Sequence, residues 1–246
     1  MSGESNKVAL VTGASRGIGA AIAQRLARDG FTVIVNYAGN AKDAEAVASK
    51  IEANGGKAIT AQADVSNPAS VARMFDAAEA AFGGIDVVVN NAGLMKLATL
   101  AETSDELFDS HVAVNLKGTF NVLREASRRL REGGRIINMS SSMVGLRQPT
   151  YGVYAATKAG VEAMTHILTK ELRGRNITVN TVAPGPTATD LFLDGKPQAV
   201  IETFRKLSPL ERLGRPEDIA GVVAFLAGPD GAWVNGQVLR ANGGVI

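Results

Sequence analysis

Residues 8–26 constrain the fold of this chain more than any other stretch. An apolar run at residues 8–11 leads into a small and polar segment at residues 12–19, and aliphatic side chains then recur every fourth position, at Ile18, Ile22 and Leu26. This pattern predicts a buried strand, a glycine-rich turn and an amphipathic helix. The first N–H groups of such a helix have no backbone partner and can bind a diphosphate, which the helix dipole also favours.

The three glycines of the turn follow the spacing G-x-x-x-G-x-G. Gly13 permits a sharp turn, Gly17 lets the backbone approach a ligand, and Gly19 lets the helix pack closely on the strand. This spacing differs from the more common G-x-G-x-x-G, and a tight turn in any strand–helix unit would carry similar residues. The rest of the chain has to decide between a ligand-binding loop and an ordinary turn.

The composition is that of a globular protein. The chain has 246 residues, 46% of them hydrophobic and 20% charged, which suits one α/β domain with a sizeable core. The net charge of +2, from 26 basic and 24 acidic residues, gives no electrostatic reason to expect nucleic acid or a membrane as a partner. Because the chain has no cysteine, it can form neither disulfides nor thiolate metal sites, and we expect no metal centre.

Two further features bear on where the protein is found. Residues 1–7 lack the apolar segment of a signal peptide. No apolar run approaches the ~18 residues that a membrane span requires. We therefore expect a cytoplasmic protein.

Apolar strand-like segments alternate with helical patterns along the whole chain. Besides residues 8–11, the predicted strands are residues 31–35, 58–61, 85–89, 136–139, 177–182 and 237–239. The alternation predicts a doubly wound parallel sheet of the Rossmann type, with helices on both faces, in a single domain covering residues 1–246. Residues 187–210 form a semi-irregular insertion after Pro184-Gly185-Pro186, and we expect this insertion to be a lid on the substrate side.

Small and polar residues gather where the predicted strands end. They are residues 12–19, Asp64, residues 90–93, residues 140–142 and residues 184–189. Ligands of open parallel sheets bind beyond the carboxyl ends of the strands. These segments therefore predict one shared cofactor site.

Tyr154 and Lys158 lie four residues apart on a predicted helix, which places them side by side on one face. A phenol has a pKa near ~10, and a neighbouring ammonium group stabilises its phenolate. Such a pair can exchange protons with a substrate, and a hydroxyl across from it could hold a carbonyl oxygen. Taken alone, however, a tyrosine and a lysine at this spacing also occur by chance.

Six short motifs occur in order along the chain: Thr12-Gly13-x3-Gly17-x-Gly19, Asn90-Asn91-Ala92-Gly93, Val114-Asn115-Leu116-x-Gly118, Ser140-Ser141-Ser142, Tyr154-x3-Lys158 and Pro184-Gly185. Together they resemble the short-chain dehydrogenase/reductase family in its single-domain form. The resemblance spans the whole chain, and six motifs in the same order do not arise by coincidence. It implies an oxidoreductase that uses a nicotinamide cofactor.

The resemblance implies catalytic roles for four residues. Tyr154 would be the general acid in carbonyl reduction and the base in the reverse reaction. Lys158 would lower the pKa of Tyr154 and hold the nicotinamide ribose. Ser141 would orient and polarise the substrate carbonyl, and Asn115 would position a water that relays protons to Lys158.

The resemblance also implies where the cofactor binds. Asp64 would meet the adenine, Asn91 the adenosine ribose side, and Val182, Gly185 and Thr187 the nicotinamide end. The full set of expected cofactor-binding residues is Gly13, Ser15, Arg16, Gly17, Ile18, Gly19, Asn36, Asp64, Val65, Asn91, Ala92, Gly93, Tyr154, Lys158, Pro184, Gly185 and Thr187.

The serine run leaves one assignment open. The family usually has two serines after this strand, whereas this chain has three. Counting from the strand, and thirteen residues back from Tyr154, selects Ser141; counting back from Gly145 selects Ser142. We favour Ser141. Tyr151 has no lysine four residues later and is expected to line the substrate pocket, while His111, His166 and Trp233 are expected to pack or face solvent.

Cofactor choice depends on the end of the second strand. Enzymes that use NAD place an acidic residue there to bind the adenosine 2′-hydroxyl. Here residues 36–40 contain no carboxylate, and the first one is Asp43. Arg16, in the glycine loop, could hold a 2′-phosphate through two parallel hydrogen bonds. These features predict NADPH, although Arg16 could also simply point to solvent.

The expected function is NADPH-dependent reduction of a ketone or aldehyde, in an enzyme similar to 3-oxoacyl-thioester reductases or broad ketoreductases. One alternative is an NAD(P)-dependent sugar or polyol dehydrogenase working in the oxidative direction. A second, from a different class, is a non-catalytic cofactor-binding sensor, although sensors of this fold usually lose the tyrosine or the lysine.

We also expect a homotetramer. In relatives, the helices that here carry residues 115–130 and 154–172 pair across a two-fold axis. Small residues on the second of these helices would permit close packing there: Ala155, Ala159, Gly160 and Ala163.

Overall fold

Seven parallel strands form one sheet in the order β3-β2-β1-β4-β5-β6-β7. The computed structural model describes residues 7–246. The strands are β1 (Val8–Val11), β2 (Thr32–Tyr37), β3 (Lys57–Gln62), β4 (Val87–Asn90), β5 (Arg135–Met139), β6 (Thr178–Pro184) and β7 (Val238–Ala241). Every pairing between neighbouring strands is parallel. The order reverses between β1 and β4, which creates a crevice at the carboxyl ends of these two strands.

Helices connect the strands. They are α1 (Gly17–Arg28), α2 (Ala41–Ala53), α3 (Pro68–Phe82), α4 (Asp105–His111), α5 (Thr119–Arg129), α6 (Met143–Leu146), α7 (Gly152–Glu171), α8 (Asp190–Leu193), α9 (Gln198–Leu207) and α10 (Pro216–Ala227). Short 3₁₀ turns occur at η1 (Leu100–Glu102) and η3 (Pro229–Gly231), and a π-helical segment, η2 (Val112–Gly118), joins α4 to α5.

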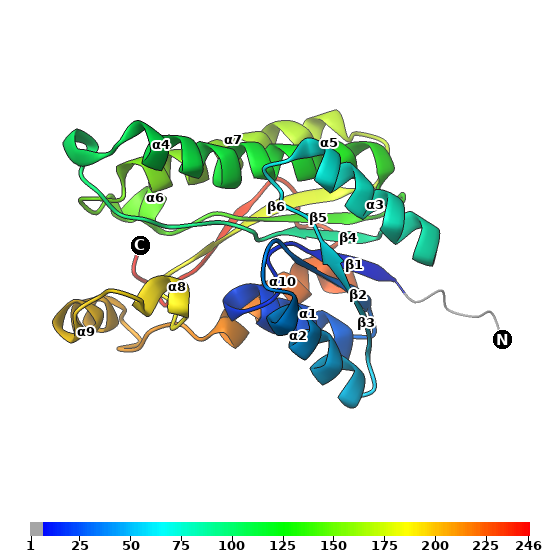
Figure 1. Cartoon of the computed structure of the whole chain (residues 1–246), viewed down its shortest axis with the longest axis horizontal. Helices are drawn as coiled ribbons and strands as arrows, with labels where there is room; N and C mark the ends of the chain where they lie inside the picture. The colour runs from blue at the N-terminus through cyan, green and yellow to red at the C-terminus, as the bar shows by residue number, and fades with distance from the viewer. Residues whose placement is uncertain (1–6) are drawn as a thin grey trace.

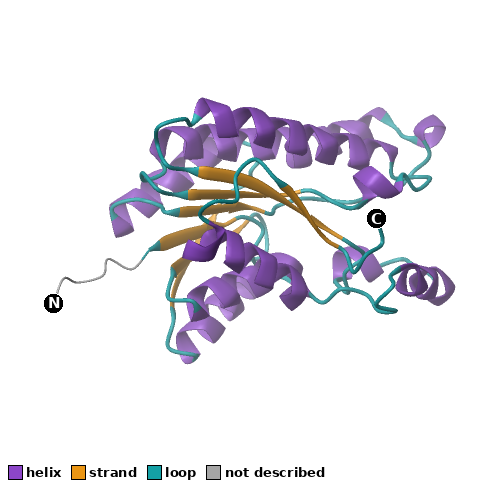
Figure 2. Cartoon of the chain, turned by 180° about the vertical axis from the view of Figure 1, so that it is seen from behind, coloured by secondary structure: helices purple, strands orange, loops and turns teal. Residues whose placement is uncertain are grey.

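The sheet lies between two layers of helices, with α1, α2 and α10 on one face and α3, α5 and α7 on the other (Figures 1 and 2). Side chains of β1 alternate between the two cores, since Ala9 and Val11 pack on the first and Val8 and Leu10 on the second. Because both faces are covered, the central strands are buried along their whole length. The predicted doubly wound parallel sheet is therefore confirmed.

Two predicted segments differ in detail from the structure. The long helical region before Gly133 is interrupted by the π turn η2, which reflects tertiary contacts that a periodic pattern does not reveal. Residues 187–210, expected to be semi-irregular, contain α8 and α9; the Thr189 hydroxyl caps α8 by accepting a hydrogen bond from the Phe192 N–H at 3.3 Å.

Two observations bear on localisation. Within residues 7–246, no helix combines the length and the apolar character needed to cross a membrane. Residues 1–6, which carry most of the expectation about a signal peptide, lie outside the described part of the chain.

Candidate active site

The glycine loop after β1 is fastened to the segment that follows β4. The Thr12 hydroxyl accepts the N–H groups of Asn91 at 2.9 Å and Ala92 at 3.0 Å. In return, the Asn91 side-chain amide donates to the carbonyls of Thr12 at 2.9 Å and Gly13 at 3.1 Å. These bonds hold the ends of two neighbouring strands together at the point where the strand order reverses.

Glycine is required in this loop for two reasons. Gly13 and Gly17 have φ angles of +61° and +56°, in the left-handed region that favours glycine. A Cβ at Gly13 would lie 2.9 Å from the Ala92 Cα, and one at Gly19 would meet the Gly13 carbonyl. The backbone of the glycine loop therefore packs so closely on Ala92 and on the loop itself that there is no room for a Cβ at Gly13 or Gly19. Of the two interpretations of the glycines, a ligand-binding loop fits this arrangement because the loop borders a large cavity.

That cavity has a volume of about 510 Å³ and runs from the glycine loop across the ends of β2, β3 and β4. Twelve of the expected cofactor-binding residues line it: Gly13, Ser15, Arg16, Gly17, Ile18, Gly19, Asn36, Asp64, Val65, Asn91, Ala92 and Gly93. Thr189, Asp190 and Leu191 close it from the side of α8. The size of the cavity, its position at the start of α1 and its glycine cradle fit the adenosine diphosphate half of a dinucleotide.

Asn36 borders this cavity, but its side chain bonds to the backbone of the glycine loop and of the segment after β3. The side chain is 1% exposed; it accepts the Gly13 N–H at 3.1 Å and donates to the carbonyls of Ala61 and Ala63 at 3.1 and 3.0 Å. These bonds occupy its amide group. Asn36 therefore shapes the glycine loop rather than presenting a free side chain to a ligand.

Arg16 lies at the mouth of the same cavity, at the N-terminal end of α1, and its side chain is exposed. Within residues 7–246 its guanidinium forms no hydrogen bond or ion pair with another side chain. Asp43 is the nearest carboxylate after β2 and also borders the cavity, where its carboxylate accepts one hydrogen bond from the Asn40 side-chain amide. The Asp43 carboxylate thus belongs to the first turn of α2.

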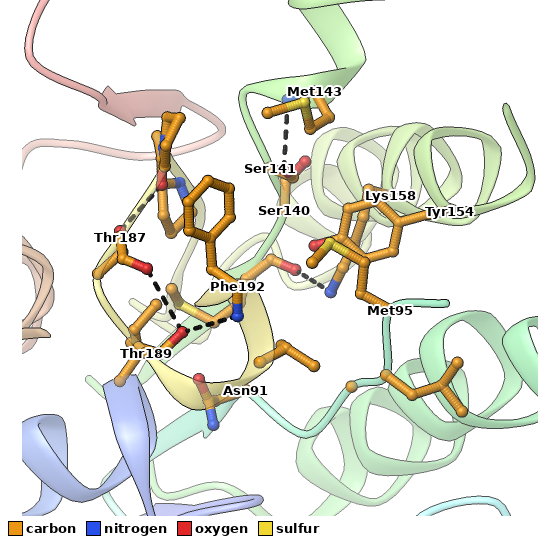
Figure 3. Close-up of a pocket in the computed structure, with 18 of the residues that line it drawn as sticks. Asn91, Met95, Ser140, Ser141, Met143, Tyr154, Lys158, Thr187, Thr189 and Phe192 are labelled. Atoms are coloured by element: carbon orange, nitrogen blue, oxygen red, sulfur yellow. Dashed lines mark hydrogen bonds between the residues drawn. The ribbon is translucent and has the colours of Figure 1, made fainter. Parts of the chain in front are cut away.

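A second, smaller cavity of about 110 Å³ adjoins the first and shares Ile18, Asn91, Gly93, Thr189 and Leu191 with it. Figure 3 shows Tyr154 and Lys158 of α7 in this pocket, with Phe192 of α8 opposite them. Ser141, Pro184, Gly185 and Thr187 line it as well. The structure thus brings together residues from four separate motifs of the sequence.

The three serines have different surroundings. The Ser140 hydroxyl donates to the Glu162 carboxylate at 2.6 Å, and the Ser142 hydroxyl, 1% exposed, donates to the Ala183 carbonyl at 3.1 Å. Ser141 lines the pocket, and its oxygen accepts the Met143 N–H at 3.2 Å. Ser140 also lines the pocket, but among the three serines only the Ser141 hydroxyl proton has no acceptor within residues 7–246.

Asn115 lies inside the π turn η2, a feature that often marks functional sites. Its side-chain amide pairs with the backbone of Leu94, accepting the N–H at 2.8 Å and donating to the carbonyl at 2.9 Å. A Cβ at Gly93 would lie 3.2 Å from Asn115 Oδ1 and 3.6 Å from Lys158 Nζ. Asn115 lines neither of the two cavities, and both its amide oxygen and the Lys158 ammonium lie close to Gly93.

Burial dominates the electrostatics of the pocket. It raises the pKa of Tyr154 to about 12, although the nearby Ser141 hydroxyl acts in the opposite direction. It lowers the pKa of Lys158 to about 8, because a buried ammonium loses its hydration. Lys158 Nζ donates to the Met139 carbonyl at 2.8 Å and lies 5.9 Å from the centre of the Tyr154 ring.

The Lys158 ammonium donates to the Met139 carbonyl and is not among the groups that shift the pKa of Tyr154. That Lys158 lowers the pKa of Tyr154 during the reaction stays a prediction. Burial therefore favours the neutral form of both side chains, the protonated phenol of Tyr154 and the uncharged amine of Lys158.

Several other residues lie where sequence analysis did not place them, or placed them only broadly. Leu94, Met95, Met139 and Met143 line the smaller pocket. The sequence signal for them is weak, because they stand next to the motifs and follow no recurring pattern of their own. Val182, expected at the nicotinamide end, is fully buried in the sheet. His111 is buried, whereas His166 and Trp233 face solvent.

The fold and the two joined cavities define a Rossmann-type dinucleotide-binding protein with the side chains of an oxidoreductase. A family model described as enoyl-(acyl carrier protein) reductase matches residues 13–246. The chain belongs to the short-chain dehydrogenase/reductase family.

Individual relatives agree with this assignment. A short-chain type dehydrogenase/reductase from Picea abies is 52% identical, over 98% of this chain and 92% of the relative. An NADPH-dependent aldehyde reductase-like protein, chloroplastic, from Arabidopsis thaliana is 48% identical, over 98% of this chain and 94% of the relative. Among solved structures, that of the angucycline C-6 ketoreductase LanV with bound NADP superposes with a TM-score of 0.92 at 40% identity, over 97% of this chain and 95% of that one.

Proposed function

We propose that this protein reduces a ketone or aldehyde to an alcohol with NADPH, and that Tyr154 is the general acid. The observation that carries the proposal is the shared pocket of Ser141, Tyr154 and Lys158, which is continuous with the glycine-loop cavity. The relatives named above as an NADPH-dependent aldehyde reductase-like protein and a ketoreductase with bound NADP support the same reaction class.

The larger cavity would hold the adenosine diphosphate half of NADPH, and the smaller one its nicotinamide end beside Gly93, Gly185 and Thr187. When bound, NADPH supplies the hydride, which carries both electrons to the carbonyl carbon. The protein supplies position and the proton. We assign Arg16 to the adenosine 2′-phosphate, because its guanidinium lies at the mouth of the cavity with no side-chain partner among the described residues.

Each pocket side chain then has one task. Ser141, whose oxygen already accepts the Met143 N–H, donates its proton to the substrate carbonyl oxygen and orients it. Tyr154 transfers its phenol proton to the same oxygen as the alcohol forms. A pKa of about 12 keeps Tyr154 protonated, and therefore able to act as an acid, at every physiological pH. Lys158, whose Nζ lies 5.9 Å from the centre of the Tyr154 ring, is its charged partner, and Asn115 fixes the backbone of Leu94 in the pocket lining.

The lining of the smaller pocket favours an apolar carbonyl compound. Besides the catalytic groups, it presents the side chains of Leu94, Met95, Met139, Met143, Leu191 and Phe192. A polyol or sugar would leave hydroxyl groups unpaired against this surface, at a cost of about 1–3 kcal/mol each. We therefore prefer a ketoreductase or a 3-oxoacyl-thioester reductase-like enzyme to a polyol dehydrogenase. A non-catalytic sensor would have no need of the complete serine, tyrosine and lysine set.

The test of the reaction is turnover of a panel of ketones, aldehydes and acyl thioesters, with NADPH consumption followed in the parent and in Tyr154→Phe. The variant should lose turnover by a factor of about a hundred or more, since a positioned acid contributes ~10²–10⁴-fold. It should bind NADPH with nearly unchanged affinity, because only the hydroxyl is removed. A parent that binds NADPH but reduces nothing in the panel would instead support the sensor.

The test of cofactor choice compares kcat/KM for NADPH and NADH in the parent, in Arg16→Ala and in the control Arg28→Ala at the exposed C-terminal end of α1. One charge-assisted contact of ~1.5–3 kcal/mol gives a preference for NADPH of roughly ten- to a hundredfold. Arg16→Ala should remove that preference and Arg28→Ala should keep it. Equal values in the parent would refute the assignment.

A further inference from the structure

Tyr151 faces the same pocket as Tyr154 and has no place in the proposed reaction. It is the residue that precedes α7, and its side chain is 4% exposed. Its ring meets the Tyr154 ring edge to face, with centres 6.3 Å apart and planes at 68°. It lines the smaller cavity together with Ser141 and Tyr154.

The hydroxyl of Tyr151 is buried and has no hydrogen-bond partner within residues 7–246. Burial also raises the pKa of this phenol, so that it stays neutral and able to donate its proton. A buried hydroxyl without a partner destabilises a protein, and native structures contain few of them. Phenylalanine would fill the same space without that cost, so packing alone does not account for a tyrosine here.

The backbone before Tyr151 is held in an unusual conformation. Arg147 and Thr150 have φ angles of +54° and +71°, in the left-handed region that side chains rarely adopt. The Thr150 carbonyl accepts the Ala98 N–H at 3.3 Å, which fixes this segment to the loop after β4. Strain of this kind persists where the surroundings hold a side chain in one place, and it is common at ligand sites. The position of Tyr151 is therefore fixed by the backbone bond of Thr150 to Ala98 before it and by the ring of Tyr154 after it.

The other polar side chains of the lining already donate hydrogen bonds to protein acceptors: Asn91, Ser140, Lys158, Thr187 and Thr189. Leu94, Met95, Met143 and Leu191 supply apolar surface, while Ser141 and Tyr154 are taken by the reacting carbonyl oxygen under the proposed function. Among the hydroxyl groups of the lining that remain, Tyr151 has no partner within residues 7–246 and is free to donate to a second oxygen of a substrate bound there.

We propose that Tyr151 is a substrate-binding residue that donates a hydrogen bond to a second oxygen of the substrate. The substrate class this selects is an apolar carbonyl compound with a further carbonyl or hydroxyl group close to the reacting one, such as a 1,2-diketone. The proposal rests on the proposed function for the location of the reacting carbonyl. Tyr151 donates the bond without transferring its proton, so the reaction's balance of atoms and electrons is unchanged.

The experiment compares the parent with Tyr151→Phe on two probes of similar shape, 1-phenylpropane-1,2-dione and propiophenone, which differ by the second carbonyl oxygen. In the variant, KM for the dione should rise about tenfold with kcat nearly unchanged, because a neutral hydrogen bond contributes that order of binding. Kinetics with propiophenone should stay within about twofold. The melting temperature of Tyr151→Phe should equal or exceed that of the parent, since the variant no longer buries an unpaired hydroxyl.

Equal losses on both probes would overturn the proposal, because they would show that the hydroxyl acts on Tyr154 or on packing rather than on the second oxygen. Calorimetric titration of both probes into the parent and Tyr151→Phe, saturated with NADP⁺ so that no reduction occurs, provides an independent readout. If the parent reduces neither probe, the proposed function fails in this panel, yet a dione affinity that depends on Tyr151 would still support the binding site. A dione affinity that is the same in parent and variant would refute it.

Discussion

Ser141 and Ser142 are neighbours in the chain, but their hydroxyl groups serve different purposes. Ser142 donates to the Ala183 carbonyl at 3.1 Å and accepts the Asn242 side-chain amide at 3.1 Å, so both of its hydrogen-bonding functions are used. Ser141 accepts the Met143 N–H and keeps its proton for the pocket. Counting along the sequence favoured Ser141 but left Ser142 open, because the difference between the two hydroxyl groups lies in partners from β6 and the C-terminal segment.

Alanine substitutions should therefore affect the two serines in different ways. Ser141→Ala should lower kcat by about a hundredfold or more, as the loss of a donor to a developing oxyanion does, and should leave stability nearly unchanged. Ser142→Ala should retain most of the activity but lower the free energy of unfolding by about 1–3 kcal/mol, because it leaves buried partners unpaired. Steady-state kinetics and urea unfolding measure the two effects. The opposite pattern would transfer the catalytic role to Ser142.

The pKa of Lys158 predicts a pH dependence of the reaction. Because burial lowers this pKa to about 8, the ammonium is present below that pH and is lost as the pH rises through it. If the charge supports proton loss from Tyr154, kcat/KM for NADPH, which reports groups of the free enzyme, should fall above pH 8. Tyr154, with a pKa of about 12, adds no change in this range.

Lys158→Arg is the matched control for this profile. An arginine stays charged throughout the accessible range, so the fall near pH 8 should disappear in whatever activity remains. A descending limb that persists unchanged in Lys158→Arg would assign the titration to another group.

At the scale of elements, residues 187–210 are firmly packed at α8 and loosely packed at α9. Phe192 of α8 is 7% exposed and meets Phe204 of α9 edge to face at 5.4 Å, yet α9 contains no buried residue. Lys196 Nζ bonds the Phe192 carbonyl at 2.6 Å and lies 4.6 Å from the centre of its ring. We propose that this segment is a lid over the substrate side of the pocket, as the sequence predicted.

Hydrogen exchange tests the lid. Amides of α9 should exchange much faster than those of β4, whose four residues are all buried, because exposed and weakly packed elements open at low cost. Addition of NADP⁺ together with a ketone should slow exchange in residues 187–210 and leave β4 unchanged. Equal protection of α9 and β4 in the cofactor-free protein would rule out a mobile lid.

The same elements show how far a sequence can predict a structure like this one. The strands and the glycine loop were predictable because apolar runs and glycines at fixed spacing are local signals. The π turn at Asn115 was not, because it depends on distant contacts, such as the pairing of Asn115 with Leu94 and the approach of Gly118 to Val65. The unpaired hydroxyl of Tyr151 and the support that Asn36 gives to Gly13 were hidden for the same reason.

At the scale of the whole molecule, α5 and α7, which lie in the same helical layer (Figure 1), both carry exposed apolar side chains. Phe120 of α5 is 47% exposed, Ile167 of α7 is 57% exposed, and the small residues Ala159 and Ala163 of α7 are exposed between turns of the helix. Trp233, 99% exposed before β7, lies outside these two helices. Groups of exposed apolar side chains on a globular protein usually mark interaction sites. We propose that this face of α5 and α7 pairs with its own copy across a two-fold axis, and that a second contact completes a homotetramer.

Light scattering at micromolar concentration should give four times the chain mass of 25.6 kDa. Ala159→Arg would insert a long charged side chain where helices must approach closely, so it should shift the mass to a smaller species. Ala46→Arg, on the exposed face of α2, makes the same chemical change away from this face and should keep the parent mass. Because the active-site residues Tyr154 and Lys158 lie on α7, loss of the pairing should also lower kcat, as the helix loses its outer support. A parent that scatters as a monomer would refute the assembly, and an unchanged mass in Ala159→Arg would move the interface elsewhere.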